Sequence, residues 1–593
     1  MYSKLSGIAL AVLTMVVPTA ASSASLDSSQ SMQNDGSIKS RENRVTRLTL
    51  LQTGDIHGHL IPRVCERCPD KPMLGGLAYM YSKIKEVRAT RSNTLLFNTG
   101  DTIQGSAEAL YTRGQALVNI LDQFGFDGYA AGNWDFVYGA ERFIELFGNG
   151  RWGGVAANVY YDPAVYPDKA GQTVLPPYRI LNVDGLRIGL LGLSTERIGL
   201  APGAFATKGF IATSEGAELP GYIDTLRNTE KVDLVVLVSE FGLAKNVYFG
   251  ENYPGIDVIF SSDMHEETPK PVITSNGTIV TEIGQDGTRL GQLDLMIRRG
   301  KIVKWNYAFH TLDIRKIKPD PKIAAMVKMA RKEFVASPFF KTHVNPFNGM
   351  VLKTPIDKVV GVVDAADGLH RSYFSDHSTP ALVEGSSHNF LADAFRDQTG
   401  ADIGHIRGFR YGTNVAQGPI KLEDLYHYIP IGPQIAKTSI TGKMLKDDLE
   451  NNIEGSINPD IFKWTGGWQQ GLSGVKYDLD VYASKGSRIQ NVKVFNRTSG
   501  TWEALDPAKS YTYAGYWYKQ NPARVGALPA SSTVTPLKGA NGETLDGTEA
   551  VVNYLKTHTA DPELGRVNLV SPLPPPVYGN PEIQPLKGIP SAH

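Results

Sequence analysis

The sequence predicts an α/β protein, and its length predicts more than one domain. From 48 to about 312, short apolar segments alternate with segments of helical spacing, a pattern typical of helices that cover a central sheet. At 593 residues the chain exceeds what one hydrophobic core supports, so a second domain is expected. Hydrophobic residues make up 41% of the chain and charged residues 20%, values that are ordinary for a globular protein.

The first domain is expected over 46–315. Its buried strands are predicted from four apolar runs, at 48–53, 94–99, 233–239 and 257–262. Helical spacing occurs at 77–91, 107–125 and 217–229. A hairpin-like pair of strands, at 277–285 and 291–310, is expected to close this domain.

A linker helix and a second domain are expected to follow. The segment 316–353 contains a helical stretch at 318–337 with prolines near its start. The second domain, over 354–560, has a helical segment at 388–400 and strand-like segments at 434–442 and 509–518. The tail at 561–593 is rich in proline, so we expect it to be extended or mobile and not to pack into a core.

The first residues have the form of a secretion signal. Lys4 supplies a positive charge, 8–17 an apolar core, and Ser22, Ser23 and Ala24 a small-residue cleavage site, so 1–24 is expected to be removed. The alternative, a membrane anchor, needs about 20 apolar residues, and this run is shorter. A polar leader at 25–45 follows, and we expect a periplasmic or secreted protein with no membrane span.

The chain has two cysteines, Cys65 and Cys68, in one short segment. In an oxidising compartment a local disulfide is the favoured interpretation. A zinc site would need four Cys or His ligands, and no second pair lies nearby. A thioredoxin-like redox role would place the motif at the start of a helix, whereas Pro69 and a loop-like composition surround this one.

Charge excludes some classes of partner. Lys and Arg number 60, as do Asp and Glu, so no net field favours nucleic acid or an anionic membrane. An anionic substrate must therefore be bound by a local site.

Polar side chains follow the predicted strands in a pattern that indicates two metal ions. Ends of parallel strands meet at one edge of a sheet, where groups far apart in sequence come together. In Asp55-x-His57 and Asp263-x-His265, residues i and i+2 are expected to project to the same side. Two divalent ions there would activate water and neutralise an anionic transition state. The candidate ligands are Asp55, His57, Asp101, Asn133, Glu240, Asp263 and His265.

Each candidate has an ordinary alternative when taken alone. Asp55 or Asp101 could cap a following helix, and Asn133 could be a turn residue. His265 alone would more often be a hydrogen-bonded surface histidine than a ligand. Their joint occurrence, in order and after successive strands, favours the metal site.

Several segments resemble the metallophosphoesterase segments of the 5′-nucleotidase superfamily. They are TGDIHGH, FNTGDT, AGNWDFVYG and the Asp-x-His motif near 263, and the C-terminal half is similar to the substrate-binding domain of that superfamily. The resemblance covers about 46–560. It implies an N-terminal α/β/β/α sandwich of the metallophosphoesterase type with a second α+β domain.

Other passages look closer to the branch of the thiosulfohydrolase SoxB. They are DTIQGSAEALYTRGQ, GNWDFVYG with Trp134, GFRYGT at 408–413, SITGKMLKDDLENN and NPDIFKWTGGWQQGLSGVKYDLD. The resemblance implies one metal ion on Asp55, His57, Asp101 and His265, and another on Asp101, Asn133, Glu240 and Asp263.

The chain departs from the family pattern at four positions. Family members usually carry histidine where this chain has Glu240 and Asp263. Nucleotidases have a catalytic histidine where Trp134 stands, and SoxB has a tryptophan there but normally a histidine at the place of Asn133. The second site would hold only oxygen donors, which favour Mn²⁺, Mg²⁺ or Ca²⁺ over Zn²⁺; Mn²⁺ is the preferred expectation. Alternatively, this second site is weak or empty.

Substrate contacts are implied mainly by the resemblance. Arg410 matches an anion-binding arginine, whose guanidinium holds phosphate or sulfonate through paired hydrogen bonds. Arg407 is a weaker candidate, and Asn389 and Trp134 are expected to face the substrate. Asp135 is a candidate catalytic residue that would orient a ligand or water, although a helix cap is an equal alternative.

Together these features predict an exported dinuclear-metal hydrolase of the SoxB-like branch. Metal-activated water would release a terminal sulfonate, as sulfate, or a phosphate from a larger carrier, which would be a SoxY-like carrier protein in the SoxB-like case. The alternatives are a periplasmic 5′-nucleotidase or phosphomonoesterase acting on nucleotides, and a non-catalytic protein with a degenerate metal site. The oligomeric state stays open.

Overall fold

The computed structural model describes residues 44–65, 68, 70–199, 203, 206–370, 383–407, 414–531, 533–577 and 586–589. The expected signal sequence and nearly all of the polar leader lie outside these residues, as does Arg410.

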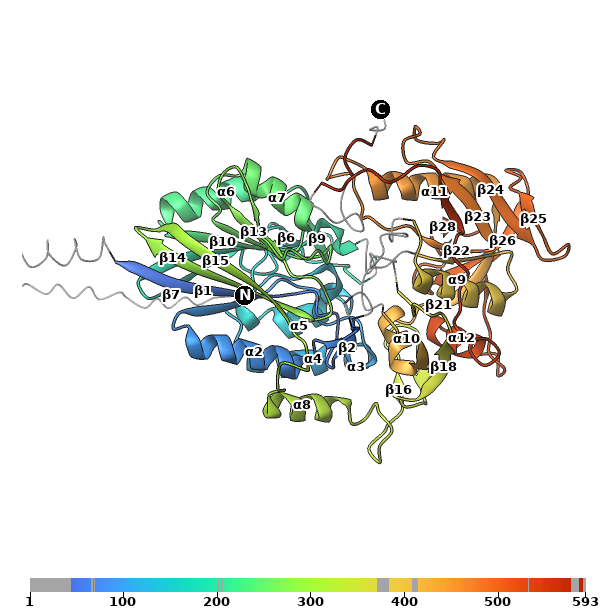
Figure 1. Ribbon diagram of the computed structural model, residues 1–593, viewed down its shortest axis with the longest axis horizontal. Coiled ribbons are helices and arrows are strands. Elements are labelled where there is room, and N and C mark those ends of the chain that lie inside the picture. Colours follow the sequence, from blue (N-terminus) through green and yellow to red (C-terminus); the bar gives the residue numbers. More distant parts are fainter. Residues whose placement is uncertain are drawn as a thin grey trace, which may run out of the picture. The chain divides into compact units, whose positions relative to one another are not determined.

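The first domain contains two large sheets (Figure 1). One has the order β15 (Lys301–Thr311), β14 (Arg289–Arg298), β1 (Val45–Thr53), β4 (Thr94–Asn98) and β5 (Gly128–Tyr129). The other has the order β12 (Val272–Ile273), β13 (Ile279–Glu282), β11 (Val258–Ser261), β10 (Leu234–Ser239), β8 (Leu186–Leu193) and β7 (Tyr178–Val183). Small two-stranded sheets pair β2 (Arg63–Val64) with β3 (Met73–Leu74), and β6 (Val159–Tyr161) with β9 (Phe210–Ala212).

Alternate side chains of the central strands enter different cores. Leu50 of β1 packs with strands of the second sheet, whereas Leu51 packs against helices on the outer face of the first sheet. Those helices are α2 (Leu77–Thr90), α3 (Ala107–Thr112), α4 (Gln115–Leu121) and α5 (Ala140–Phe147). Helices α6 (Leu219–Asp224) and α7 (Leu243–Asn252) cover the outer face of the second sheet, as Figure 1 shows. The expected α/β/β/α sandwich is confirmed.

Two details differ from the sequence-based expectations. The helix expected over 107–125 is broken into α3 and α4, because Arg113 and Gly114 have left-handed backbones with φ of 49° and 82°. The expected hairpin pair belongs to different sheets: β13 pairs with β11, and β14 pairs with β15.

Helix α8 (Pro321–Arg331) lies within the expected linker. Asp320 caps its first turn, and Arg331 at its end forms ion pairs with Glu108 of α3 and with Glu423. Glu423 belongs to α10 (Leu422–Tyr428) of the second domain, so buried charges tie the linker to helices on both sides of it.

The second domain has two main sheets. One has the order β22 (Gly471–Ser473), β19 (Ile403–Ile406), β26 (Ser510–Trp517), β21 (Gln434–Thr441) and β29 (Thr535–Pro536). The other has the order β25 (Thr501–Ala504), β24 (Ile489–Asn496), β23 (Val475–Leu479) and β30 (Val567–Leu569). Two-stranded sheets pair β16 (His343–Val344) with β17 (Val351–Leu352), β18 (Val359–Val363) with β20 (Gly418–Lys421), and β27 (Arg524–Val525) with β28 (Leu528–Pro529).

Helices cover these sheets. Leucine and isoleucine recur every four residues along α11 (Gly442–Ile457), and this stripe packs into the core with β21 and β26. The other helices are α9 (Ser386–Thr399) and α12 (Gly547–Tyr554). The architecture of this part is α+β, as expected.

The proline-rich tail is more ordered in its described part than expected. Strand β30 pairs in parallel with β23, and Leu586 and Ile589 are buried in the core around α11. The expectation that this segment packs into no core is wrong, since its few apolar residues are enough to attach it.

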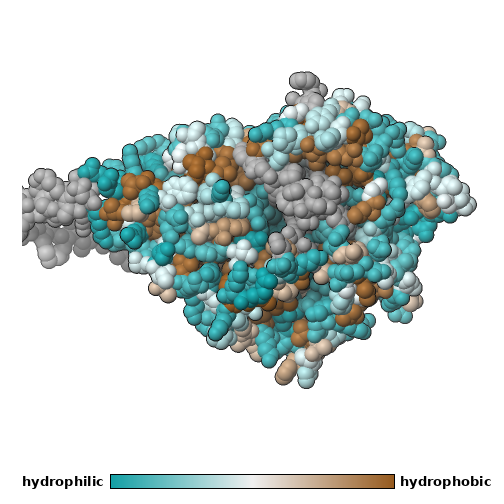
Figure 2. Space-filling view, viewed as in Figure 1, coloured by the Kyte–Doolittle hydropathy of each residue, from teal (hydrophilic) through white to brown (hydrophobic). Residues whose placement is uncertain are grey.

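The expected disulfide between Cys65 and Cys68 is confirmed. No helix among the described residues is long and apolar enough to cross a membrane. On the face shown in Figure 2, hydrophobic residues form separate patches among hydrophilic ones.

Candidate metal centre

Backbone hydrogen bonds hold two loops of the candidate site side by side. Strands β1 and β4 are parallel, with Thr53 opposite Asn98, and each runs directly into one of these loops. The Asp55 amide donates to the Gly100 carbonyl at 3.0 Å, and the His57 amide donates to the Asp101 carbonyl at 2.9 Å. Strand pairing therefore continues as loop pairing, which brings candidates from distant parts of the sequence next to each other.

The loops have an unusual backbone. Five of the candidate ligands, all of them residues other than glycine, have φ between 45° and 89°: Asp55, His57, Asp101, Asp263 and His265. This left-handed region is uncommon for such residues, and its strain is often found at functional sites. Residues i and i+2 converge here through a strained turn beyond the end of the strand. The sequence analysis expected the alternation of side chains along a strand to bring them together, and that reason is wrong.

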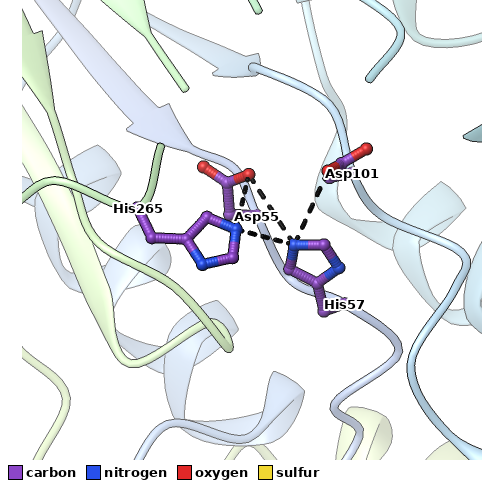
Figure 3. Close-up of side chains that lie close together, drawn as sticks. All are labelled: Asp55, His57, Asp101 and His265. Carbon is purple, nitrogen blue, oxygen red and sulfur yellow. Dashed lines mark hydrogen bonds and ion pairs between the residues drawn. The ribbon is translucent and has the colours of Figure 1, made fainter. Parts of the chain in front are cut away.

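A first cluster consists of Asp55, His57, Asp101 and His265 (Figure 3). One ligand atom from each lies within 4.8 Å of the others, and all four residues are buried. The Nε2 atoms of the two imidazoles are 2.9 Å apart. His265 Nε2 lies 3.5 Å from Asp55 Oδ1, and His57 Nε2 lies 3.6 Å from Asp101 Oδ2.

Two glutamines orient the imidazoles of this cluster. Gln104 Oε1 lies 2.9 Å from His57 Nδ1, and Gln285 Oε1 lies 2.5 Å from His265 Nδ1. A carbonyl oxygen only accepts, so each Nδ1 donates, and a ring that carries its proton on Nδ1 presents the lone pair of Nε2 to the other. Two lone pairs and two carboxylates that face one another form a donor set for a cation, and the first cluster therefore fits a divalent metal ion.

A second cluster consists of Asp101, Glu240 and Asp263. Their ligand atoms also lie within 4.8 Å of one another, and all three residues are buried. Glu240 and Asp263 follow β10 and β11, which are parallel with Ser239 opposite Ser261. Three carboxylates at this distance repel one another unless a cation lies among them, and oxygen donors suit a hard divalent ion.

Asn133 and Trp134 border the second cluster. The Asn133 amide N–H donates to Glu240 Oε2 at 3.1 Å, and the Trp134 amide N–H donates to Asp101 Oδ1 at 2.8 Å. The side-chain orientation that satisfies both ends of the Asn133 amide places its nitrogen 3.1 Å from Asp263 Oδ1 and its oxygen 3.1 Å from Trp134 Nε1. All the candidate ligands thus lie in or beside one of the two clusters.

Arg197 also reaches the second cluster. It lies in a short turn, Glu196–Gly199, that follows β8, and its guanidinium forms an ion pair with Asp263. The Arg197 side chain is 16% exposed and that of Asp263 is 1% exposed, so the arginine approaches from the solvent side. The sequence analysis missed Arg197, although its place after a strongly apolar strand is the same signal that identified Glu240.

The carboxylate of Asp135 is occupied by hydrogen bonds from its own neighbourhood. Its Oδ1 accepts from the Thr102 amide at 2.8 Å and from the Ile103 amide at 3.2 Å. Its Oδ2 accepts from the Tyr129 hydroxyl at 2.7 Å and from the Gly132 amide at 3.1 Å. Burial raises the pKa of Asp135, while these hydrogen bonds lower it. The geometry gives Asp135 a positioning role, since it joins the loop of Asp101 to the loop of Asn133.

The predicted substrate residues lie in several places. Arg407 is exposed at the end of β19. Asn389 is buried in α9, where its amide donates to Glu384 Oε1 at 2.6 Å and to the Glu563 carbonyl at 2.9 Å. These two hydrogen bonds join α9 to the segments that contain Glu384 and Glu563. The prediction for Arg410 falls outside the described residues.

Comparison with known proteins gives one family match. Residues 359–524 match the family model of the 5′-nucleotidase C-terminal domain. The chain is 22% identical over 576 residues to a probable 5′-nucleotidase of Treponema pallidum, where the match covers 86% of this chain and 92% of that protein. It is 24% identical over 486 residues to Endonuclease YhcR of Bacillus subtilis, where the match covers 78% of this chain and 37% of that protein. The chain thus spans well under half of the second relative.

Two solved structures are similar over most of their length. A 5′-nucleotidase precursor from Thermus thermophilus has a TM-score of 0.73 at 20% identity, covering 89% of this chain and 100% of that one. The sulfate thiohydrolase SoxB of Thermus thermophilus has a TM-score of 0.72 at 21% identity, covering 91% of this chain and 98% of that one. Both confirm the expected fold, and their near-equal TM-scores do not separate the two branches.

Proposed function

We propose that this chain, a member of the 5′-nucleotidase superfamily of metal-dependent hydrolases, releases a terminal sulfonate, as sulfate, or a terminal phosphate from a larger carrier. The observation that carries the proposal is the first cluster, in which two imidazoles and two carboxylates from three distant loops converge within 4.8 Å. Such a donor set is built for a cation and has no evident structural purpose without one.

The metal ions would be divalent, with Mn²⁺ preferred and Mg²⁺, Ca²⁺ or Zn²⁺ as alternatives. The first cluster would hold one ion, and Asp101, Glu240 and Asp263 would hold another. Asn133 would join the second ion if its amide turned its oxygen from Trp134 toward the carboxylates. When bound, such ions supply Lewis-acid activation of water and neutralise negative charge in the transition state.

The presence of Trp134 favours a substrate whose leaving group departs without taking up a proton. Its indole N–H donates a hydrogen bond but does not transfer a proton. In the sulfonate reaction, water oxygen bonds to the sulfonate sulfur and the water protons pass to solvent. The bond between the sulfonate sulfur and the adjacent sulfane sulfur breaks with its electron pair on the sulfane sulfur, which stays on the carrier cysteine. The leaving group is then the persulfide anion of the carrier cysteine. A persulfide is more acidic than an ordinary thiol, whose pKa is about 8.5, so its anion leaves without general-acid help, whereas the alkoxide of a nucleoside is far more basic. This difference favours the SoxB-like substrate.

The carrier would be a protein arm with a cysteine S-thiosulfonate, comparable to a SoxY-like carrier. We place the reaction in the periplasm or outside the cell. The form of the first 24 residues and the disulfide between Cys65 and Cys68 support this location.

The second candidate is a periplasmic 5′-nucleotidase or phosphomonoesterase. The relative from Treponema pallidum, a probable 5′-nucleotidase, favours it, as does Asn133.

One set of assays tests both candidates. Purified full-length chain with Mn²⁺ is offered a carrier peptide with a cysteine S-thiosulfonate, AMP, and p-nitrophenyl phosphate. We expect sulfate release from the peptide, which Asp101→Ala abolishes. Phosphate release from AMP without sulfate release would reverse the order of the two candidates. No hydrolysis and no retained metal would indicate a non-catalytic protein with a degenerate site.

A further inference from the structure

The two clusters differ in the way their charges are balanced by the protein. In the first cluster, Gln104 and Gln285 accept from the outer nitrogens of His57 and His265, so that both lone pairs point inward. Each histidine is thereby prepared to bind a cation. Asp101 is shared between the two clusters.

In the second cluster, donors of the chain itself already contact the carboxylates. Glu240 accepts from the Asn133 backbone, and the side-chain orientation that satisfies both ends of the Asn133 amide puts its nitrogen 3.1 Å from Asp263 Oδ1. Asp263 Oδ2 accepts from the guanidinium of Arg197. The positive charge of Arg197 therefore already contacts Asp263, a carboxylate that a second divalent ion would need as a ligand.

Arg197 is well placed to stay there. Its side chain is largely buried, with 16% exposure, and a guanidinium keeps its charge at any ordinary pH. It also donates to the backbone carbonyl of Thr465 at 3.2 Å. The residue before it, Glu196, forms an ion pair with Lys245 of α7, which anchors the same turn.

We propose that Arg197 is an internal cation of the second cluster, and that it competes with a divalent ion for Asp263. The two clusters then fill in sequence, the histidine-containing cluster first. This inference rests on the proposed metal centre, and it makes Arg197 the residue that sets the affinity for the second ion. Entry of that ion requires the guanidinium to leave Asp263, which also changes the contact with the Thr465 segment.

A Mn²⁺ titration of the metal-free full-length chain tests the proposal without an activity assay. Electron paramagnetic resonance measures free Mn²⁺, and a coupled spectrum reports a pair of ions. We expect two steps in the wild type, with the second at least about tenfold weaker than the first. In Arg197→Met the second step tightens by about tenfold, since a partly buried ion pair no longer opposes it. The first step stays unchanged.

Two variants serve as controls. Glu196→Gln removes the neighbouring ion pair with Lys245 and leaves both steps as in the wild type. Arg197→Lys keeps the charge and keeps the second step weak. Thermal melting of each variant verifies that it is folded, and Arg197→Gln repeats the test with a polar side chain.

The outcomes separate this inference from the proposed function. Equal affinities in the wild type, or an unchanged second step in Arg197→Met and Arg197→Gln, would overturn the role of Arg197 and leave the metal centre standing. A chain that binds no Mn²⁺ at all would overturn the metal centre itself.

Discussion

The orientation of single side chains sets the chemistry of the first cluster. His57 and His265 point Nε2 toward each other because Gln104 and Gln285 accept hydrogen bonds at Nδ1. A histidine without such a partner would populate both tautomers and several ring orientations. The glutamines therefore lower the cost of organising the site before an ion binds.

Substitution of Gln104 tests this positioning role. In Gln104→Met, His57 loses its acceptor at Nδ1, and we expect Mn²⁺ affinity of the first cluster to fall by about 10- to 100-fold. Equilibrium dialysis with metal analysis measures the change. The matched control is Gln398→Met, which removes only an exposed hydrogen bond to Asp397. An unchanged affinity in Gln104→Met would show that His57 needs no outer partner.

Trp134 allows a test of the leaving-group argument. Trp134→His places a group that can donate a proton beside Asp101, and we expect hydrolysis of AMP to rise by about 100-fold. Sulfate release from a thiosulfonate carrier should not rise, because a persulfide anion needs no proton to leave. Trp134→Phe is the control, since it removes the indole without adding an acid. A rise of the same size in Trp134→Phe would attribute the effect to space alone.

The candidate ligands that were predicted from strand ends lie in the two clusters. The sequence indicated Asp55, Asp101 and Asp263 because each follows a buried strand, and parallel strands meet at one edge. It did not indicate Gln104, Gln285 or Arg197. The place of Arg197 after an apolar strand was a local signal. Its contact with Asp263, and the contacts of Gln104 and Gln285, depend on where a side chain points after two sheets and their loops have packed.

At the level of elements, α8 shows how local chemistry starts a helix. Asp320 accepts from the amides of Lys322 and Ile323, both at 3.0 Å, and Pro321 occupies the first helical position. Asp320 also forms an ion pair with Lys85 of α2. The carboxylate of Asp320 can therefore stabilise the fold in two ways, as a helix cap and as the partner of Lys85.

Two variants distinguish these contributions. Asp320→Ala removes both and should lower the free energy of unfolding by about 1 kcal/mol, mainly through the lost cap. Lys85→Met removes the ion pair alone, and we expect no measurable change because that side chain is exposed. Chemical denaturation followed by circular dichroism measures both. An equal loss in the two variants would assign the stabilisation to the ion pair.

The break between α3 and α4 shows a limit of local patterns. The apolar spacing over 107–125 continues through the break, so periodicity predicts one helix. The left-handed backbone at Arg113 and Gly114 turns the chain instead, and a Cβ at Gly114 would lie 2.8 Å from the side chain of Ile103. Tertiary packing, not helix propensity, decides the boundary.

The whole molecule buries several titratable groups, and these link its stability to pH. His405 is fully buried, and burial lowers its pKa to about 3. Burial raises the pKa of Asp546 to about 6 and that of Glu549 to about 7, so these carboxyl groups act in the opposite direction on acidification. The pH dependence of the free energy of unfolding is therefore a sum of opposing contributions, and a single-site variant is needed to isolate one group.

His405→Gln isolates the histidine. Below pH 6.5 the unfolded chain protonates His405 while the folded chain does not until pH is near 3, so this group costs stability as pH falls through that window. Between pH 7 and pH 5.5 the cost is about 1 kcal/mol. Gln does not titrate, so from pH 7 to pH 5.5 the wild type should lose this amount of unfolding free energy relative to His405→Gln. A gap that is the same at both pH values in thermal melts would contradict the shift.

The amino-acid sequence alone predicted the α/β class, the buried strands at the site and the candidate metal ligands that follow those strands, because strand periodicity and strand-end chemistry are local. Tertiary structure alone decided that β13 and β14 belong to different sheets. It also decided that the tail packs into a core and that Arg197 meets Asp263. These outcomes depend on contacts between segments far apart in the chain, where pairing and side-chain direction are selected by packing as a whole.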